Sequence, residues 1–420
     1  MAFGFAFSGF LLIGLFSIYA LFILLFLEIV LLYSGLIQLT GERQHQRMMS
    51  LGDENTIKIA LHNASNLKLK LELFDEVPFQ FQWRDFKMNH ALAPEAKETL
   101  CYSLRPVTRG EYAFGNLNAF VSIWLGLCSR RYVLSKPTTL PVMPSVIQMK
   151  KYELLAFSKI STMDGIKKLR RIGHSYEFEQ IRPYADGDDL RSVNWKATGR
   201  RNQIMVNQYQ EERSQNVYLI LDKSRTMHMP FNGLSLLDYS INSSLVLGNI
   251  ALKKYDRVGL ISYSHRIGST LPAERNEIQL KKLMNALYHE RPQEFEADFD
   301  LLYRSVKNII KNRSLIILYT NFESTYAMER ALPVLQKVNR QHLLVVIIFE
   351  NSELTSYQST KAEFVSDIYS QTITAKLMSD KRQMVNRLKK FGIQTILSKP
   401  EDLSINTVNK YLELKAKGLI

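Results

Sequence analysis

The hydrophobic pattern begins with a long apolar stretch. Residues 3–39 are almost entirely Phe, Leu, Ile, Val, Gly and Ala, and Glu28 is the only charged residue before position 42. A helix over this whole stretch would extend about 55 Å, whereas the hydrocarbon core of a bilayer is about 30 Å thick. Within residues 1–40 we therefore expect either one transmembrane helix that overshoots the bilayer or a hairpin of two spans with a tight turn near residues 14–19.

The charges that flank this stretch predict its orientation. Arg43 and Arg47 follow it, and no Lys or Arg precedes it. Because positively charged flanks tend to stay in the cytoplasm, we expect a cell (inner) membrane protein with cytoplasmic soluble domains. A secretory signal fits less well, since it begins with basic residues and has an apolar run of only about 7–15 residues. The chain has only two cysteines, Cys101 and Cys128, and this low number agrees with a reducing compartment. We expect both to be small core residues rather than partners in a disulfide bridge.

The next region alternates between apolar and polar residues. Residues 56–61 and 67–74 alternate, and the turn-forming residues 63–66 separate them. A period of two places one face of a strand in a core and the other in water, as in antiparallel sheets. We therefore predict a β-sandwich domain over residues 48–146.

The C-terminal half shows a different pattern. Three short runs, at 217–221, 315–320 and 343–349, are continuously apolar. Strands of this kind need cover on both faces, which is typical of a parallel sheet between helices. Helical periodicity follows or precedes these runs at residues 234–254, 277–288 and 299–311. We predict a doubly wound, Rossmann-like α/β domain over residues 214–420, joined to the sandwich by a connecting segment at 147–213.

Composition narrows the possible function classes. The chain has 420 residues, 54 Lys and Arg against 40 Asp and Glu, and a net charge of +14. These values exclude a short disulfide scaffold, a collagen-like chain and an acidic disordered chain. The basic residues are dispersed and have no aromatic stacking motif, so we expect no nucleic-acid partner. Beside a membrane anchor, an anionic lipid surface or ordinary solvated charge accounts for them.

The first candidate site follows the predicted strand 217–221. Asp222, Ser224 and Thr226 place one carboxylate and two hydroxyls where ligands gather in open α/β sheets, at the carboxyl end of a strand. Such hard oxygen ligands suit Mg²⁺. The alternative is that these are turn residues, with Asp222 or Ser224 capping the next helix.

The second candidate is an acidic cluster that would suit an enzyme. Asp186, Asp188 and Asp189 surround Gly187 and could hold a metal for a membrane-bound, metal-dependent hydrolase. Arg182 and Arg191 flank the cluster, and pairing with these arginines is the simpler explanation. Neither a nucleophile set in a familiar setting nor a Gly-rich phosphate loop is present in the sequence. We therefore expect a non-enzymatic protein.

The residues from 176 to 201 resemble the motif of a known family. The motif comprises Glu177, Phe178, Arg182, Pro183, Tyr184, Asp186, Gly187, Asp188, Asp189, Arg191, Asn194, Trp195, Arg200 and Arg201. It resembles the signature of the bacterial family called domain of unknown function 58, as does the Arg-Gly-Glu-Tyr sequence at 109–112. This resemblance implies a membrane-tethered protein that acts with a MoxR-type AAA+ ATPase and assists the maturation or regulation of other proteins.

The downstream sequence resembles a von Willebrand factor type A domain. Residues 222–226 and 256–260 carry this likeness, which implies a metal-ion-dependent adhesion site. Such domains generally add a threonine from a second loop and an aspartate after the fourth strand. Here Asp298 and Asn321 stand in the corresponding regions. The resemblance thus implies a degenerate Mg²⁺ site formed by Asp222, Ser224, Thr226, Asn321 and Asp298.

Overall fold

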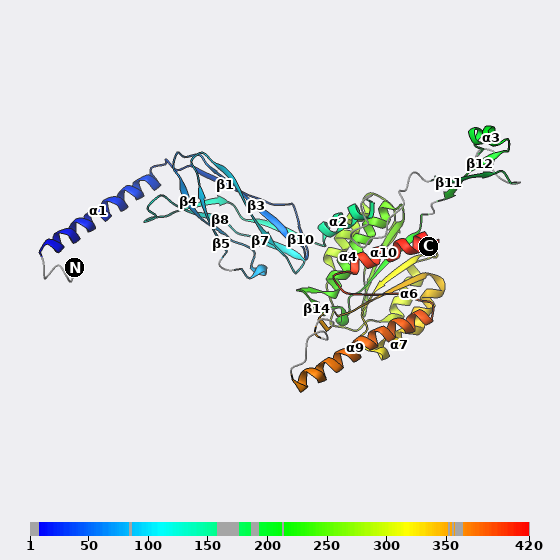
Figure 1. The fold of residues 1–420 in the computed structure, drawn as a ribbon. Coiled ribbons are helices and arrows are strands. Elements are labelled where there is room, and N and C mark those ends of the chain that lie inside the picture. The colour runs from blue at the N-terminus through cyan, green and yellow to red at the C-terminus, as the bar shows by residue number, and fades with distance from the viewer. Residues whose placement is uncertain are drawn as a thin grey trace. The chain divides into compact units, whose positions relative to one another are not determined.

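The computed structural model describes residues 8–83, 86–157, 176–185, 193–211, 214–351, 353–354, 357 and 364–419. The chain divides into two compact units, Met1–Met143 and Pro144–Ile420 (Figure 1). The finer division predicted above, into parts at 1–40, 48–146, 147–213 and 214–420, stays a prediction. Each unit is described by itself.

The first unit begins with a single long helix, α1 (Ser8–Tyr33). It runs without interruption through residues 14–19, so the predicted hairpin turn is wrong. The helix ends before Gly35, whose φ of 81° suits the left-handed conformation that commonly terminates helices. Its segment Ile13–Tyr33 has a hydropathy of 2.7, which makes it long and apolar enough to cross a membrane. By length and composition alone, a signal sequence near the N-terminus also meets this criterion.

Three sheets of mainly antiparallel strands form the rest of the first unit, as the alternating hydrophobic pattern predicts. The first has the order β1 (Leu39–Gln44), β3 (Asn55–Asn63), β6 (Lys97–Leu104). The second has the order β5 (Lys87–Leu92), β4 (Leu69–Asp75), β8 (Leu117–Ser122), β9 (Arg130–Ser135). The third has the order β2 (Met49–Ser50), β10 (Thr138–Met143), β7 (Gly110–Phe114). Burial alternates along β3 and β4, which confirms the period of two.

Two expectations about this unit are corrected. Cys101 is exposed on β6 rather than part of the core, because it falls on the solvent side of an alternating strand; both cysteines are free. Arg43 is 4% exposed and lies inside the sandwich, since β1 begins at Leu39, well before residue 48. Of the two arginines expected to flank the membrane span, only Arg47 is exposed.

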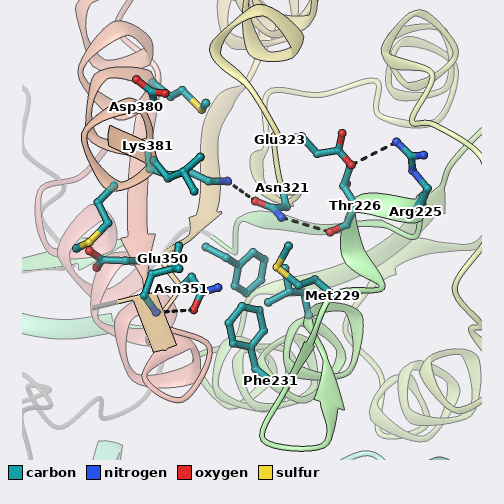
Figure 2. Close-up of a pocket in the computed structure, with 16 residues that line it drawn as sticks. Arg225, Thr226, Met229, Phe231, Asn321, Glu323, Glu350, Asn351, Asp380 and Lys381 are labelled. Atoms are coloured by element: carbon teal, nitrogen blue, oxygen red, sulfur yellow. Dashed lines mark hydrogen bonds and ion pairs between the residues drawn. The ribbon is translucent and has the colours of Figure 1, made fainter. Parts of the chain in front are cut away.

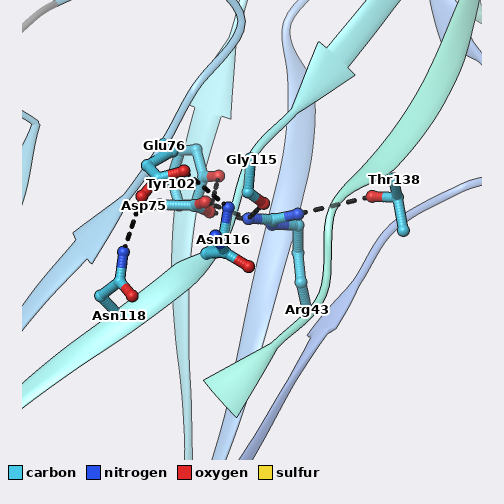
Figure 3. Close-up of polar contacts among 8 residues, drawn as sticks. All are labelled: Arg43, Asp75, Glu76, Tyr102, Gly115, Asn116, Asn118 and Thr138. Carbon is cyan, nitrogen blue, oxygen red and sulfur yellow. Dashed lines mark hydrogen bonds and ion pairs between the residues drawn. The ribbon is translucent and has the colours of Figure 1, made fainter. Parts of the chain in front are cut away.

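Arg43 belongs to a buried polar network (Figure 3). Its guanidinium forms an ion pair with Asp75, to which Nε donates at 3.1 Å. Nη2 also donates to the carbonyl oxygen of Gly115 at 3.1 Å, and Nη1 to the Thr138 hydroxyl at 3.4 Å. Tyr102 donates its hydroxyl to Oδ2 of Asp75 at 2.5 Å. The network therefore links β1, β4, β6 and β10.

The second unit contains a six-stranded sheet. Its order is β17 (Ile267–Glu274), β16 (Arg257–Tyr263), β13 (Asn216–Asp222), β18 (Leu315–Tyr319), β19 (Leu343–Phe349), β20 (Gln394–Ser398). All neighbours pair in parallel except β17, which is antiparallel to β16. Numbered along the chain, the order is 3-2-1-4-5-6, which is that of a doubly wound sheet. The predicted apolar strands at 217–221, 315–320 and 343–349 are confirmed.

Helices cover both faces of this sheet. One core layer brings together side chains from α2 (Val146–Phe157), α4 (Leu236–Lys253), α5 (Gln279–His289) and α10 (Leu403–Ala416). The other contains side chains from α6 (Phe299–Ile309), α7 (Thr325–Gln341) and α9 (Val365–Lys390). Leu219 of β13 packs into the first layer and Ile220 into the second. This explains why the central strands show no alternation: both of their faces are buried.

The region predicted as a connecting segment is partly integrated into this unit. α2 packs on α4, where Asn249 donates to Oε2 of Glu153 at 2.7 Å and the backbone N–H of Ser145 donates to Oδ1 of Asn242 at 2.8 Å. Further along, β11 (Tyr176–Pro183) and β12 (Met205–Glu211) form an antiparallel pair around α3 (Trp195–Arg201). A short pair, β14 (Pro230–Phe231) and β15 (Leu234–Ser235), precedes α4.

Candidate functional site

Asp222 ends the central strand β13 at the point where the strand order reverses. Its side chain is inaccessible, with 1% of the residue exposed. Oδ1 accepts the backbone N–H of Ser224 at 2.8 Å, and Oδ2 accepts the hydroxyl of Thr320 at 2.7 Å. Burial raises the pKa of Asp222, although the hydrogen bonds from Ser224 and Thr320 oppose this shift. Within the described ranges, none of the ion pairs involves Asp222.

Two hydroxyls complete the first loop. Ser224 is fully buried, and its Oγ lies 3.1 Å from Oγ1 of Thr226. This is the distance of a hydrogen bond between the two hydroxyls, and it is also close to the separation of about 2.9 Å between adjacent ligands of an octahedral Mg²⁺ at about 2.0–2.1 Å. Ser224 precedes the short helix Arg225–Met227, but its side chain makes no capping hydrogen bond. The capping alternative is therefore wrong for the Ser224 hydroxyl, whereas the Asp222 carboxylate does accept a bond within the turn.

The other two predicted ligands have different partners. Asp298 caps α6, because its Oδ1 accepts the backbone N–H of Leu301 at 2.9 Å. Asn321 donates Nδ2 to the carbonyl oxygen of Thr226 at 3.3 Å, and its Oδ1 accepts from the ammonium of Lys381 at 2.7 Å. The donor set of Asp222, Ser224 and Thr226 therefore fits a cation that keeps several waters. Asn321 and Asp298 do not extend this donor set in the arrangement observed.

Lys381 of α9 is a component that sequence reasoning missed. Its Nζ also donates to the carbonyl oxygen of Phe322 at 2.6 Å. Burial lowers the pKa of Lys381 to about 8, while the nearby charge of Glu323 opposes this shift. Lys381 is separated by many residues from the loops it contacts, and nothing in its local sequence distinguishes it from the other basic residues of α9. Thr320 was also missed, because it reads as the last residue of an apolar strand.

A cavity of about 490 Å³ adjoins the candidate site (Figure 2). Thr226 and Asn321 form part of its wall, next to Lys381. Its apolar lining comprises Met229, Phe231, Leu236, Phe349, Leu354, Leu377, Met378 and Met384. Its polar lining comprises Arg225, Glu323, Glu350, Asn351 and Asp380. A mainly apolar cavity with a few polar groups is typical of a ligand-binding pocket.

A buried ion pair joins the first loop, residues 222–226, to residues 290–298. Nζ of Lys223 lies 2.9 Å from Oε2 of Glu290, and Ser262 donates its hydroxyl to Oε1 of Glu290 at 2.6 Å. Burial raises the pKa of Glu290, but the hydrogen bonds from Ser262, Ser269 and Lys223 outweigh it and lower the pKa overall. The backbone N–H of Arg225 donates to the carbonyl oxygen of Phe295 at 3.0 Å. These contacts fix the first loop against residues 290–298.

Much of the family-like motif is not among the described residues. Asp186, Gly187, Asp188, Asp189 and Arg191 lie outside the described residues, as does the side chain of Glu177. The arginine pairing of the acidic cluster and the hydrolase alternative therefore stay predictions. Across the described ranges, no group of three or more His, Cys, Asp or Glu residues could hold a metal.

The described motif residues lie in or next to β11 and α3. Arg182 donates Nη1 to the carbonyl oxygen of Pro183 at 3.2 Å, and the backbone N–H of Tyr184 donates to the carbonyl oxygen of Ile204 at 2.8 Å. Asn194 caps α3 by accepting the backbone N–H of Ala197 at 3.0 Å. Trp195 starts that helix and is 77% exposed, which leaves its ring on the surface of this unit.

Solved structures show low similarity to the chain. BatB from Bacteroides thetaiotaomicron is 13% identical, with coverage of 49% of this chain and 100% of that chain and a TM-score of 0.28. Proximal thread matrix protein 1 from the mussel byssus, solved with a zinc-occupied MIDAS motif, is 10% identical, with coverage of 47% and 45% and a TM-score of 0.27. The CARDB domain of the PF1109 protein from Pyrococcus furiosus is 14% identical, with coverage of 26% and 96% and a TM-score of 0.19. With TM-scores this low, the fold rests on the strand order of this chain.

Sequence comparison gives a more direct relationship. The uncharacterized protein YeaD of Bacillus subtilis (strain 168) is 27% identical over 210 residues, which cover 46% of this chain. The chain spans about half the length of this curated relative, 51%. The matching family model includes part of the β11–β12 pair and most of the α/β sheet. Over residues 180–367 the chain matches the family described as "Protein of unknown function DUF58".

Proposed function

We propose that this protein is a non-enzymatic, membrane-anchored scaffold whose α/β domain binds a protein partner at the carboxyl edge of its sheet. The observation that carries this proposal is Asp222, a buried carboxylate with no ionic partner among the described residues, beside the hydroxyls of Ser224 and Thr226. A buried charge without a partner is costly, so a cation would stabilise this arrangement. The adjoining apolar cavity would receive the partner's side chains.

Mg²⁺ is the cation that suits these oxygens. Asp222, Ser224 and Thr226 would hold it, and Mg²⁺ usually keeps several waters that an incoming group can replace. When bound, the ion supplies a positive charge that attracts a carboxylate of the partner. The strand order and the position of the site at the switch point support the finer assignment to a von Willebrand factor type A fold with a degenerate adhesion site.

A lasting membrane anchor is supported by the contacts of Glu28 in α1. Its carboxylate accepts the backbone N–H groups of Gly126 and Leu127, each at 2.9 Å, and of Cys128 at 3.2 Å. Removal of α1 as a signal sequence would leave three polar groups without these partners. We infer that α1 remains attached and spans the inner membrane, with the soluble domains on the cytoplasmic side, where Arg47 carries the flanking positive charge.

The family resemblance points to the class of partner. We infer that the α/β domain associates with a MoxR-type AAA+ ATPase in a bacterial cell. An ATPase partner would account for a protein that has a binding site and no phosphate-binding loop of its own. No nucleic-acid partner is proposed.

The test is affinity capture with the full chain, solubilised in detergent and tagged, with and without Mg²⁺. We expect an AAA+ ATPase to be retained in a Mg²⁺-dependent way by the wild-type protein and lost with Asp222→Ala. Glu329→Ala, at an exposed position on α7, is the matched control and should retain it. Unchanged capture by Asp222→Ala would remove the site assignment, and calorimetry without Mg²⁺ uptake would remove the metal.

A further inference from the structure

The loop between β8 and β9, residues 123–129, is joined to α1 by a set of directed hydrogen bonds. Three successive backbone N–H groups, those of Gly126, Leu127 and Cys128, point to the two carboxylate oxygens of Glu28. Gly126 has a φ of 73°, a conformation that glycine adopts readily, and consecutive N–H groups in such turns form a concave site for an anion. Glu28 itself is 1% exposed. The loop is therefore built around this one side chain of the helix.

A second contact fixes the end of α1. Arg130, the first residue of β9, donates Nη1 to the carbonyl oxygen of Leu32 at 2.8 Å. Its guanidinium also lies 4.6 Å from the ring centre of Tyr33 and 4.9 Å from that of Tyr132. A cation at the carboxyl end of a helix is favoured by the helix dipole. Together, Glu28 and Arg130 set the direction in which α1 leaves the sandwich.

The same loop exposes large apolar side chains. Trp124 is 65% exposed, Leu125 39% and Leu127 45%. Such a cluster is unusual for a loop in water, where it would favour aggregation or mark an interaction surface. Lys70 reaches the loop and donates its ammonium to the carbonyl oxygen of Trp124 at 3.2 Å. An apolar tip beside basic side chains is typical of a segment that lies at an anionic membrane surface.

The position of Glu28 along α1 gives the depth of the loop. The apolar segment Ile13–Tyr33 is long enough to cross the hydrocarbon core, and Glu28 lies five residues, or about 7.5 Å along the helix, from its C-terminal end. Glu28 therefore lies near the boundary between acyl chains and headgroups. The loop is bonded to Glu28 at this same level, where Trp side chains are enriched in membrane proteins.

We propose that residues 123–129 form a second membrane contact, in which Trp124, Leu125 and Leu127 insert into the lipid interface next to α1. This proposal rests on the proposed function only in that α1 spans a bilayer. Two contacts would hold the sandwich at a fixed orientation to the membrane, whereas a helix with a free linker would not. Glu28 positions the loop, and it also satisfies backbone N–H groups that lipid could not.

Fluorescence of single tryptophans tests the proposal. The chain has three tryptophans, so Trp83→Phe with Trp195→Phe leaves Trp124, and Trp124→Phe with Trp195→Phe leaves Trp83. Trp83 is the matched control because it lies toward the opposite end of β4. Trp83 follows the end of β4 at Asp75, whereas the 123–129 loop follows Ser122, which pairs with Lys70 near the start of β4. Each full-length variant is reconstituted in vesicles of phosphatidylcholine and phosphatidylglycerol, with nitroxide-labelled lipid or aqueous iodide as quencher.

We expect nitroxide near the top of the acyl chain to quench Trp124 more than nitroxide near its end. We also expect a quenching constant for iodide about fivefold lower for Trp124 than for Trp83, because interfacial Trp is withdrawn from bulk water. Full iodide access without lipid quenching would overturn the proposal. Protection from iodide without lipid quenching would also overturn it, because another protein surface would then cover the loop.

Two further measurements separate the possible failures. Glu28→Gln, placed in the Trp124 background, should raise iodide access to Trp124 while Trp83 is unchanged in the parallel background. Unchanged lipid quenching of Trp124 in that variant would overturn the positioning role of Glu28. Flotation with the vesicles tests α1 separately. If the protein floats but Trp124 is exposed to water, only the proposed lipid contact of the loop is contradicted. If the protein does not float, both the membrane span of α1 and the lipid contact of the loop are contradicted.

Discussion

The ammonium of Lys381 lies 2.7 Å from Oδ1 of Asn321, although 60 residues separate them in the sequence. Asn321 follows β18 at the same edge of the sheet at which Asp222 ends β13. The ammonium of Lys381 therefore donates a hydrogen bond to the amide oxygen of Asn321, the atom that the family resemblance would make a metal ligand. This pairing places a positive charge beside the candidate cation site.

Removal of that charge should strengthen Mg²⁺ binding. Like charges repel, and the repulsion is larger in a partly buried site than in water. We expect Lys381→Met to lower the Kd for Mg²⁺ by up to about tenfold, or about 1.4 kcal/mol. Isothermal titration calorimetry measures this directly, with Lys376→Met on the exposed side of α9 as control. An equal or higher Kd in Lys381→Met would contradict the assignment of the site.

Lys381 should titrate below the ordinary range of a lysine side chain. Burial lowers its pKa from 10.5 to about 8. Between these pH values the unfolded chain holds a proton that the folded chain has lost, so the free energy of unfolding rises with pH in this window. Below pH 8 the charged amine costs stability. NMR of lysine labelled with ¹³C at Cε should show one resonance with an apparent pKa near 8 that is missing in Lys381→Met; titration of every lysine near 10.4 would refute this.

Asp222→Asn should separate stability from metal binding. Burial raises the pKa of Asp222, so the folded protein holds this proton more tightly than the unfolded chain. The free energy of unfolding then falls as pH rises from the ordinary value until the raised folded pKa is passed. The asparagine variant avoids this loss and should gain about 2–4 °C in Tm at neutral pH without Mg²⁺, the shift that about 1 kcal/mol produces in a unit of this size.

The same variant should lose the stabilisation that Mg²⁺ gives the wild type. At 100 times Kd, a ligand that binds only the folded state adds about 2.7 kcal/mol. Thermal unfolding with and without Mg²⁺ measures both effects, and Asp300→Asn, exposed in the first turn of α6, is the control. A lower Tm for Asp222→Asn would mean that the hydrogen bonds of the carboxylate outweigh the cost of its charge.

Arg43→Met should destabilise the sandwich strongly. It leaves Asp75 buried without its ionic partner, and breaking a buried pair in this way costs about 3–5 kcal/mol. Lys87→Met removes one partner of the exposed pair with Glu72 and should cost at most about 1 kcal/mol. Guanidinium denaturation followed by Trp83 fluorescence, in the Trp124→Phe/Trp195→Phe background, compares them. Equal costs for the two variants would mean that Arg43 does not stabilise the core.

Some features of the site followed from local sequence alone. Asp222, Ser224 and Thr226 were predictable because they follow a fully apolar strand, and the carboxyl ends of parallel strands carry sites. Their convergence is local, within five residues, and the structure keeps it. Asp298 was predicted as a ligand but caps α6, because the backbone N–H groups of a helix start compete for the same carboxylate. Its sequence position could not distinguish the two roles.

The sequence by itself determined the elements that have a clear hydrophobic pattern: the continuously apolar helix α1, the alternating strands of the sandwich and the continuously apolar strands around β13. Such a pattern reports which faces of an element are buried, because local chain geometry fixes the direction of successive side chains. Only the tertiary structure decided that Arg43 lies in a core beside Asp75, that Lys381 reaches Asn321 and that Glu28 binds the 123–129 loop. Each of these contacts joins residues 32 or more apart in sequence. From sequence alone, such charged side chains are interpreted as solvated or membrane-facing. In the folded protein they can be buried, because a specific partner that is close in space offsets the cost of burying the charge.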